Sequence, residues 1–210
     1  MNKLLIEKDF DADEISGLYS CFKPAEKSYA KDEVVMRMSD KSDDVGIITD
    51  GTAYLVSINS DGQKSIVNCY RRGDIFGGCF SPNSLLNAYY IVTHTACNIT
   101  YISYKKLTSR CEKCCEKHVR LLDLFISTSV RRWQIHIDIL SQRTIRSRLI
   151  YYFTYLASEE GTGKVKLPMS LSDLADYLSV DRSAMMREIK KLNSDGIIRS
   201  KGTDVEVLRI

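Results

Sequence analysis

Basic and polar side chains recur on one face of a predicted helix near the C-terminal end of the sequence. The apolar residues Met185, Ile189 and Leu192 are spaced four and three apart, which places them on one buried face. The opposite face is left with Arg182, Ser183, Met186, Arg187 and Lys190. Arginine and lysine are the side chains that bind phosphates and the edges of guanine bases. This face therefore indicates a polyanionic partner, although a solvated charged surface would show the same pattern.

The residues around this face predict a helix-turn-helix followed by a hairpin. Ser170-Leu171-Ser172-Asp173 has the pattern of a capping box that begins a first helix. After a short break, Asp181 is placed to cap the second helix. Lys201-Gly202, followed by a strand with alternating valines, predicts a terminal hairpin that would serve as a wing. The combination favours DNA binding over a merely solvated helix, with the N-terminal half of the second helix meeting the bases.

A second group of reactive side chains has the spacing C-x2-C-C-x2-H. In a helix, Cys111, Cys114, Cys115 and His118 would share one face, so a zinc ion or a redox bridge is conceivable. One continuous helix strains a tetrahedral site, however, and zinc ligands usually come from two separate elements. Thiols without a function remain the alternative. The seven cysteines are an odd number without a secretory signal, which favours reduced thiols over a disulfide framework.

We do not expect an enzyme. Catalysis would need a nucleophile with a base, or paired carboxylates in a pocket. The best pair, Cys115 with His118, lacks an evident orienting acid or oxyanion donor.

Composition indicates a globular protein with a basic C-terminal third. The chain has 210 residues, 44% of them apolar, and its net charge of +3 lies entirely within residues 143–210. No run of eighteen apolar residues occurs, and the first residues turn acidic before a signal core forms. We therefore expect a cytoplasmic protein without a membrane span.

Short β-branched and aromatic segments follow one another between residues 34 and 104, which predicts a small barrel or roll. The candidate strands are VVMRM (34–38), VGIIT (45–49), TAYLVSI (52–58), SIVNCY (65–70), YYIVTH (89–94) and CNITYISY (97–104). Asp50-Gly51 and Asn59-Ser60-Asp61-Gly62 are hairpin signals. A helix is expected over residues 9–22, ended by Pro24.

A long helix with a heptad pattern follows the roll. Its predicted a/d seam is Val119, Leu122, Ile126, Ser129, Trp133, His136 and Leu140. A second apolar line lies on another face, through Leu121, Phe125, Ile135 and Ile139. We expect a symmetric dimer along the seam, with burial inside a monomer as the alternative, because Ser129 and His136 weaken the pattern. Ser141-Gln142-Arg143-Thr144 is the expected hinge, before a helix that starts at Ile145.

Two long segments resemble the Crp/Fnr regulators. LSDLADYLSVDRSAMMREIKKLNSDGIIRSKG is similar to their helix-turn-helix, and GIITDGTAYLVSINSDGQKSIVNCYRRGDIFGG is similar to their β-roll. The resemblance implies an α+β fold with a cyclic-nucleotide-binding-like double-stranded β-roll sensor (1–110), a dimerisation helix (111–140) and a winged helix-turn-helix (141–210). It also implies a sequence-specific transcriptional regulator that binds double-stranded DNA as a homodimer and contacts RNA polymerase.

The resemblance suggests roles for individual residues. Arg182 and Arg187 fall where family members read guanines, and Ser183 replaces a glutamate, so the target sequence should differ. Ser170 and Ser172 match positions that hold DNA phosphates, and we expect Lys190 to contact phosphate as well. A dimer would then bind a palindromic operator. Ser179 stands where the turn commonly carries glycine, which puts the turn geometry in question.

The resemblance would make cyclic nucleotide the effector, but the residues argue against it. Between Ile75 and Tyr104 the chain has no Asp, Glu, Lys or Arg, and the family's glutamate and arginine positions correspond to Gly78 and Asn87. We therefore expect no cyclic AMP response and no assigned cofactor. An unidentified neutral or aromatic effector would meet a pocket formed by Phe76, Gly77, Gly78, Cys79, Asn87, Ala88 and Tyr89, with Phe80 and Tyr90 nearby. The alternative is that these side chains simply fill the roll. Only Cys21 lies where oxygen-sensing members carry a cysteine cluster, so we expect no iron–sulfur site of that kind.

Overall fold

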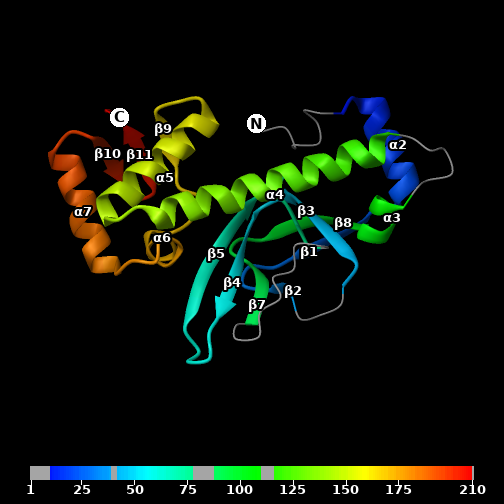
Figure 1. Cartoon of the computed structure of the whole chain (residues 1–210), viewed down its shortest axis with the longest axis horizontal. Helices are drawn as coiled ribbons and strands as arrows, with labels where there is room; N and C mark the ends of the chain where they lie inside the picture. The colour runs from blue at the N-terminus through cyan, green and yellow to red at the C-terminus, as the bar shows by residue number, and fades with distance from the viewer. Residues whose placement is uncertain (1–9, 39–41, 78–87, 110–115, 210) are drawn as a thin grey trace. The chain divides into compact units, whose positions relative to one another are not determined.

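The computed structural model describes residues 10–38, 42–77, 88–109 and 116–209 (Figure 1). The chain divides into two compact units, Met1–Arg132 and Trp133–Ile210. The division falls inside the longest helix, α4 (Lys117–Ser141). No helix among the described residues is both long enough and apolar enough to cross a membrane.

The first unit is built on two four-stranded antiparallel sheets, which confirms the predicted roll. Their strand orders are β1-β8-β3-β6 and β2-β7-β4-β5. All six candidate strands are present. The strands are β1 (Ala25–Tyr29), β2 (Val34–Arg37), β3 (Asp44–Asp50), β4 (Thr52–Ile58), β5 (Lys64–Arg71), β6 (Ile75–Gly77), β7 (Ala88–Thr93) and β8 (Cys97–Ser103). The prediction missed β1, whose residues are mostly exposed, and the three-residue β6.

Of the two predicted hairpins, only the second is present. The hairpin predicted at Asp50-Gly51 is wrong, because β3 and β4 lie in different sheets and this turn carries the chain from one sheet to the other, whereas β4 pairs with β5. Gly51 lies between β3 and β4 with φ 89°, in the left-handed region that glycine adopts without strain. Between β4 and β5, the side chain of Asn59 accepts hydrogen bonds from the N–H groups of Asp61 and Gln63. This local bonding fixes the turn that the sequence signal predicts.

A second apolar core lies outside the roll, on the outer face of the sheet β1-β8-β3-β6. It joins Val45 and Ile102 of that sheet to Leu18 and Phe22 of α2 (Ala12–Phe22) and to Leu121 of α4. Asp11 caps α2 in a full capping box, and Lys23 ends it with a left-handed backbone before Pro24. The short helix α3 (Tyr104–Thr108) contributes Leu107 to the same core.

The long helix α4 is confirmed, but the predicted seam is wrong at two positions. Ser129 and His136 are buried within the chain, at 8% and 7% exposure. The exposed apolar residues of α4 are instead Val119 (69%), Ile126 (42%), Val130 (54%) and Ile137 (63%). The polar heptad positions therefore turn toward the chain's own core, and the exposed apolar stripe continues one residue later, through Val130 and Ile137. The second apolar line is largely as predicted, because Leu121, Phe125 and Ile139 are buried.

The second unit packs three helices on a small antiparallel sheet of order β10-β11-β9. Its elements are α5 (Ile145–Glu160), β9 (Lys164–Lys166), α6 (Leu171–Tyr177), α7 (Arg182–Ser194), β10 (Ile198–Lys201) and β11 (Asp204–Val207). The expected hinge coincides with the end of α4 at Ser141 and with Thr144, which caps α5. The α+β class, with a roll, a long helix and a winged helix-turn-helix along the chain, is confirmed.

Candidate nucleic-acid interface

The second helix of the motif, α7, is positioned by its buried face and its cap. Met185, Ile189 and Leu192 are buried, as their spacing predicts. The side chain of Asp181 accepts a hydrogen bond of 2.7 Å from the N–H of Ala184, which satisfies one of the free donors at the start of the helix. These contacts fix the direction in which the other face of α7 points.

That other face is exposed and cationic. Arg182, Ser183, Arg187 and Lys190 are all exposed, and Met186 lies among them. Within the residues that the structure describes, neither arginine nor Lys190 forms an ion pair with an acidic side chain of this chain. Their donors are therefore available to a partner, and the structure brings together the four residues predicted on this helix.

The only acid between residues 182 and 191 is Glu188, and it is bound by an arginine of α5. Its carboxylate accepts a hydrogen bond of 3.0 Å from Arg146 of α5, and Asp195 accepts a second bond of 2.6 Å from the same guanidinium. Hydrogen bonds to Asp195 and then to Glu188 raise the pKa of the Arg146 guanidinium above its ordinary value. Arg146 thus neutralises the acids beside α7, a role that sequence reasoning missed because its partners lie 42 and 49 residues away.

The two serines of the first helix lie at its exposed start. The Ser170 hydroxyl accepts from the N–H of Asp173 at 3.2 Å and donates to the Asp173 carboxylate at 2.8 Å. The predicted N-cap is thereby confirmed. Ser172 is exposed in the first turn of α6, so both serines are accessible to a ligand at this end of the helix.

The turn between α6 and α7 has the left-handed residue that the family pattern implies. Ser179 has φ 52°, a conformation that glycine adopts more readily than serine. Arg148 of α5 supports this turn, because its guanidinium donates to the carbonyl oxygens of Leu178 at 2.8 Å and Ser179 at 3.4 Å. The substitution of serine for glycine is therefore accommodated, and the turn keeps its geometry.

The wing is joined directly to α7. The side chain of Asn193 donates to the hydroxyl of Ser200 and accepts from its N–H, both at 2.8 Å, which ties the end of α7 to β10. Lys201 lies at the tip of the hairpin and Lys166 on the adjoining strand β9; both are exposed. Sequence reasoning gave neither lysine a role, although Lys201 belongs to the predicted hairpin and Lys164-Val165-Lys166 alternates as a strand does.

The residues predicted for an effector pocket are only partly described. Phe76 is buried inside the roll against Tyr70 and Tyr101, and a Cβ added at Gly46 would clash with its ring. Gly77 is buried with φ 86°, Ala88 is exposed, and Tyr89 is half-buried. Gly78, Cys79, Phe80 and Asn87 lie outside the described residues. Phe76 therefore belongs to the core of the roll.

Of the predicted metal ligands, only His118 is described; Cys111, Cys114 and Cys115 lie outside the described residues. His118 is buried, and its Nε2 lies 3.1 Å from the sulfur of Cys21. Its Nδ1 lies 3.4 Å from the carbonyl oxygen of Ser109. Sequence reasoning set Cys21 aside, because a separation of 97 residues gives no local signal of this contact.

Two family models match the chain in succession. The cyclic nucleotide-binding domain matches residues 26–114, and the Crp-like helix-turn-helix domain matches residues 147–210. The first covers the two sheets of the roll, and the second covers α5 to β11.

Relatives and solved structures agree with these matches. The transcriptional activator protein FnrL of Cereibacter sphaeroides is 23% identical over 187 residues, which is 84% of this chain and 73% of FnrL. The nitrogen fixation regulation protein FixK of Rhizobium meliloti is 23% identical over 182 residues, 86% of this chain and 78% of FixK. The structure of FixK2 from Bradyrhizobium japonicum superposes with a TM-score of 0.71 at 22% identity, covering 88% of this chain and 92% of that one. With both domain models in order and a matching fold, the chain belongs to the Crp/Fnr family of transcriptional regulators.

Proposed function

We propose that this chain is a sequence-specific DNA-binding regulator that reads its operator with Arg182, Ser183 and Arg187 and responds to an effector other than cyclic AMP. The observation that carries the proposal is the exposed basic face of α7, whose neighbouring acid Glu188 is bound to Arg146. The resemblance adds RNA polymerase as a further partner and implies no catalytic activity.

The two arginines are proposed to donate bidentate hydrogen bonds to guanine O6 and N7. Each such pair contributes about 1–3 kcal/mol of discrimination between bases. Ser170, Ser172 and Lys190, together with Lys166 and Lys201 of the wing, are proposed to contact phosphates and so to set position without specifying sequence.

Selection of bound sequences from random duplex DNA, followed by gel shifts, tests this assignment. Arg187→Ala should lose discrimination between the selected operator and a scrambled one, whereas Lys190→Ala should weaken binding to both sequences. Arg37→Ala is the matched control, because Arg37 is an exposed arginine on β2 of the first unit. If Arg187→Ala kept full discrimination, the base-reading role would be refuted.

A homodimer along α4 is proposed from the exposed stripe Val119, Ile126, Val130 and Ile137. Exposed apolar residues at heptad-like spacing favour helix pairing over solvation. Two recognition helices would then bind a palindromic operator. In analytical ultracentrifugation, Ile126→Lys should shift the protein from dimer to monomer and Lys117→Ala should not; a dimer that survived Ile126→Lys would contradict the interface.

The effector is proposed not to be cyclic AMP, although one matching model is named for cyclic nucleotides. A cyclic nucleotide carries a phosphate anion, and residues 75–104 contain no lysine or arginine to neutralise it. Calorimetry should show no binding of cyclic AMP at micromolar concentrations. Tight binding in that experiment would refute this part of the proposal.

A metal- or redox-sensing regulator is the second candidate, now supported by the contact between Cys21 and His118. Cysteine sulfur and imidazole nitrogen are both metal ligands, and a thiolate is also the oxidisable form of cysteine. The site would combine Cys21 and His118 with Cys111, Cys114 and Cys115. Anaerobically purified protein should then contain zinc or iron, which His118→Leu and Cys21→Ser should each remove. Protein that is metal-free, with DNA affinity unchanged by peroxide, would exclude this candidate.

A further inference from the structure

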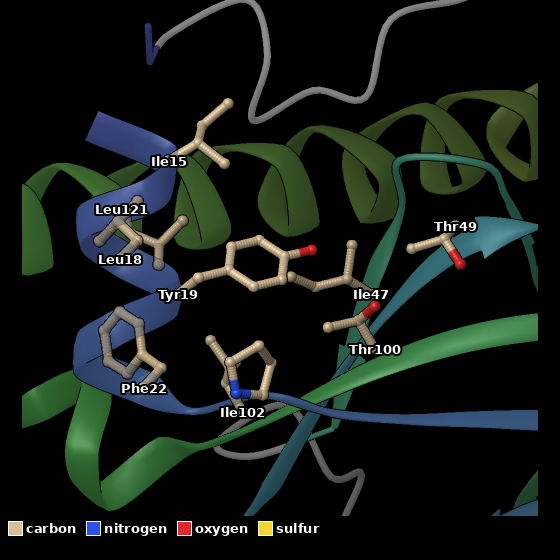
Figure 2. Close-up of a pocket in the computed structure, with 10 residues that line it drawn as sticks. Ile15, Leu18, Tyr19, Phe22, Ile47, Thr49, Thr100, Ile102 and Leu121 are labelled. Atoms are coloured by element: carbon tan, nitrogen blue, oxygen red, sulfur yellow. The ribbon is translucent and has the colours of Figure 1, made fainter. Parts of the chain in front are cut away.

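A hollow lies outside the roll, between α2 and the outer face of the sheet β1-β8-β3-β6. Leu18, Tyr19 and Phe22 of α2 line one side, and Ile47, Thr100 and Ile102 of β3 and β8 line the other. Figure 2 shows the ring of Tyr19 extending from α2 toward Ile47. Leu121 of α4 also lines the hollow. This site is separate from the effector pocket predicted around Phe76, because it lies on the opposite face of the sheet.

The chemistry of the walls restricts what the hollow can hold. None of the residues lining it carries a charge, so a carboxylate or phosphate would find no counter-ion there. Its volume is about 50 Å³. One water molecule takes up about 10–15 Å³ of cavity volume. A ligand fragment of about four heavy atoms therefore fits inside. Tyr19 is 47% exposed, which leaves a way out beside its ring for the rest of a longer ligand.

One buried polar atom in the wall of the hollow has no partner among the described residues. Thr100 is 5% exposed, and its hydroxyl makes no hydrogen bond among the residues that the structure describes. A buried hydroxyl without a partner costs free energy, so such groups are normally satisfied. Thr49, the other threonine at this site, is different, because its hydroxyl donates to the carbonyl oxygen of Asn98 at 2.9 Å.

We propose that this hollow binds a small uncharged molecule, such as a short-chain alcohol, that is apolar except for one group hydrogen-bonded to Thr100. Two contacts link the site to α4: Glu14 of α2 pairs with Arg120 at 2.6 Å, and Cys21 lies against His118. A ligand beside α2 therefore acts on the helix that carries the exposed stripe. The role of this molecule as an effector rests on the proposed function of the chain as a DNA-binding regulator. Its binding in the hollow does not depend on that function.

The test uses the full-length chain with two probes of equal heavy-atom count, 1-butanol and 1-chlorobutane. Methyl NMR of Ile47 and Ile102 should show saturable shifts with 1-butanol, with a dissociation constant in the millimolar range expected for so small a ligand. Thr100→Val is isosteric and keeps a β-branched residue in the strand, so the fold is retained. It should reduce the preference for 1-butanol over 1-chlorobutane about two- to tenfold, the effect of one hydrogen bond.

Matched variants separate a ligand contact from a structural effect. Thr100→Ser keeps the hydroxyl and should retain the preference, as should Thr49→Val, whose lost hydroxyl was already bonded to the chain. Thr100→Val should also raise the Tm of the free protein, because it removes an unpaired buried group. An absence of methyl shifts, or an unchanged preference in Thr100→Val, would mean that the hollow holds only water and would overturn the site.

Gel shifts on the selected operator distinguish ligand binding in the hollow from an effect of that binding on DNA affinity. If 1-butanol changes operator affinity in the wild type but not in Thr100→Val, the site is an effector site. If the chain binds its operator and 1-butanol binds by NMR without altering that affinity, the effector role is refuted. If no operator is found while the methyl shifts persist, the failure lies with the proposed function and not with the site.

Discussion

Arg148 of α5 donates a hydrogen bond of 2.8 Å to the carbonyl oxygen of Leu178, the residue that closes the first helix of the DNA-binding motif. The same guanidinium donates to the carbonyl oxygens of Leu140 and Gln142 at the end of α4. One side chain thus joins the end of the long helix to the turn that positions α7. Carbonyl groups at helix ends have no partner within the helix, so Arg148 satisfies groups that would otherwise need water.

Arg148→Met should destabilise the second unit and weaken operator binding. The substitution keeps much of the apolar stem of the side chain but removes the guanidinium that donates hydrogen bonds to several carbonyl oxygens. One hydrogen bond from a charged group contributes about 1.5–3 kcal/mol. We expect the free energy of unfolding to fall by about 2–3 kcal/mol in urea titrations followed by circular dichroism. Arg143→Met, at an exposed position of the hinge, is the control and should change stability by less than about 0.5 kcal/mol. Equal stability in the two variants would show that Arg148 does not support the turn.

Ser179→Gly should stabilise the protein. A left-handed backbone costs a non-glycine residue about 1–2 kcal/mol, and part of the gain is offset by the greater freedom of glycine in the unfolded chain. A net gain of about 0.5–1 kcal/mol is expected in the same titration. Ser172→Gly is the same substitution within α6, where it should instead destabilise by about 0.5–1 kcal/mol. Two changes of the same sign would contradict the left-handed turn.

Asp74 and Arg132 form a buried ion pair that fixes α4 to the roll. Asp74 is 2% exposed and also accepts from the N–H of Arg71, while Arg132 donates to the carbonyl oxygen of Cys69. Burial raises the pKa of Asp74, and the Arg132 guanidinium opposes that shift. Removal of one partner leaves a buried charge unpaired, which destabilises proteins by about 3–5 kcal/mol.

A double-mutant cycle on this pair is therefore expected to be strongly non-additive. Asp74→Asn and Arg132→Met should each destabilise the first unit, and the double variant should cost less than their sum by about 1–3 kcal/mol. The exposed pair Lys31 with Asp32, whose charged atoms are 3.9 Å apart, is the control and should show no measurable coupling. Additive effects at Asp74 and Arg132 would indicate that the two residues stabilise the fold independently.

The sequence predicts most of this architecture because the strands and α7 show their periodicity within a few residues. Met185, Ile189 and Leu192 give the buried face of α7, and the cap at Asp181 is local. The phase of α4 was not predictable in this way, because Ser129 is buried by the tertiary fold and not by its own pattern. The strand β9 has three residues, and an alternation as short as Lys164-Val165-Lys166 does not by itself distinguish a strand from a loop.

The parts of the site that sequence reasoning missed depend on contacts between distant residues. Arg146 meets Glu188 across 42 positions, and Cys21 meets His118 across 97. Neither contact leaves a spacing signal, because only the packing of helices brings the partners together. The unpaired hydroxyl of Thr100 is likewise invisible in the sequence, where a threonine in a strand is ordinary.

His136 should make the second unit less stable in acid. Its ring stacks on the ring of Tyr177, with the two ring centroids 4.4 Å apart, and its Nε2 lies 3.0 Å from the carbonyl oxygen of Tyr177. Burial lowers the pKa of His136 below its ordinary value of 6.5, and the hydrogen bond to the Tyr177 carbonyl opposes the shift in part. Below pH 6.5 the unfolded chain therefore binds a proton that the folded chain resists, so stability falls as the pH drops from 6.5 toward the lowered folded value.

Urea titrations of the second unit between pH 7.5 and pH 5 measure this effect. The wild type should lose stability over that range, and His136→Phe, which keeps the stacked ring on Tyr177, should lose less. His94→Phe is the control, because His94 lies in the first unit, where its ring stacks on Tyr54. It should leave the pH dependence of unfolding of the second unit as in the wild type. If His136→Phe retained the full loss in acid, the pH dependence would have to arise from the carboxylates of the unit. Because His136 contacts the last residue of α6, its protonation should also loosen the turn before α7, so operator affinity should decrease over the same pH range in the wild type and less in His136→Phe.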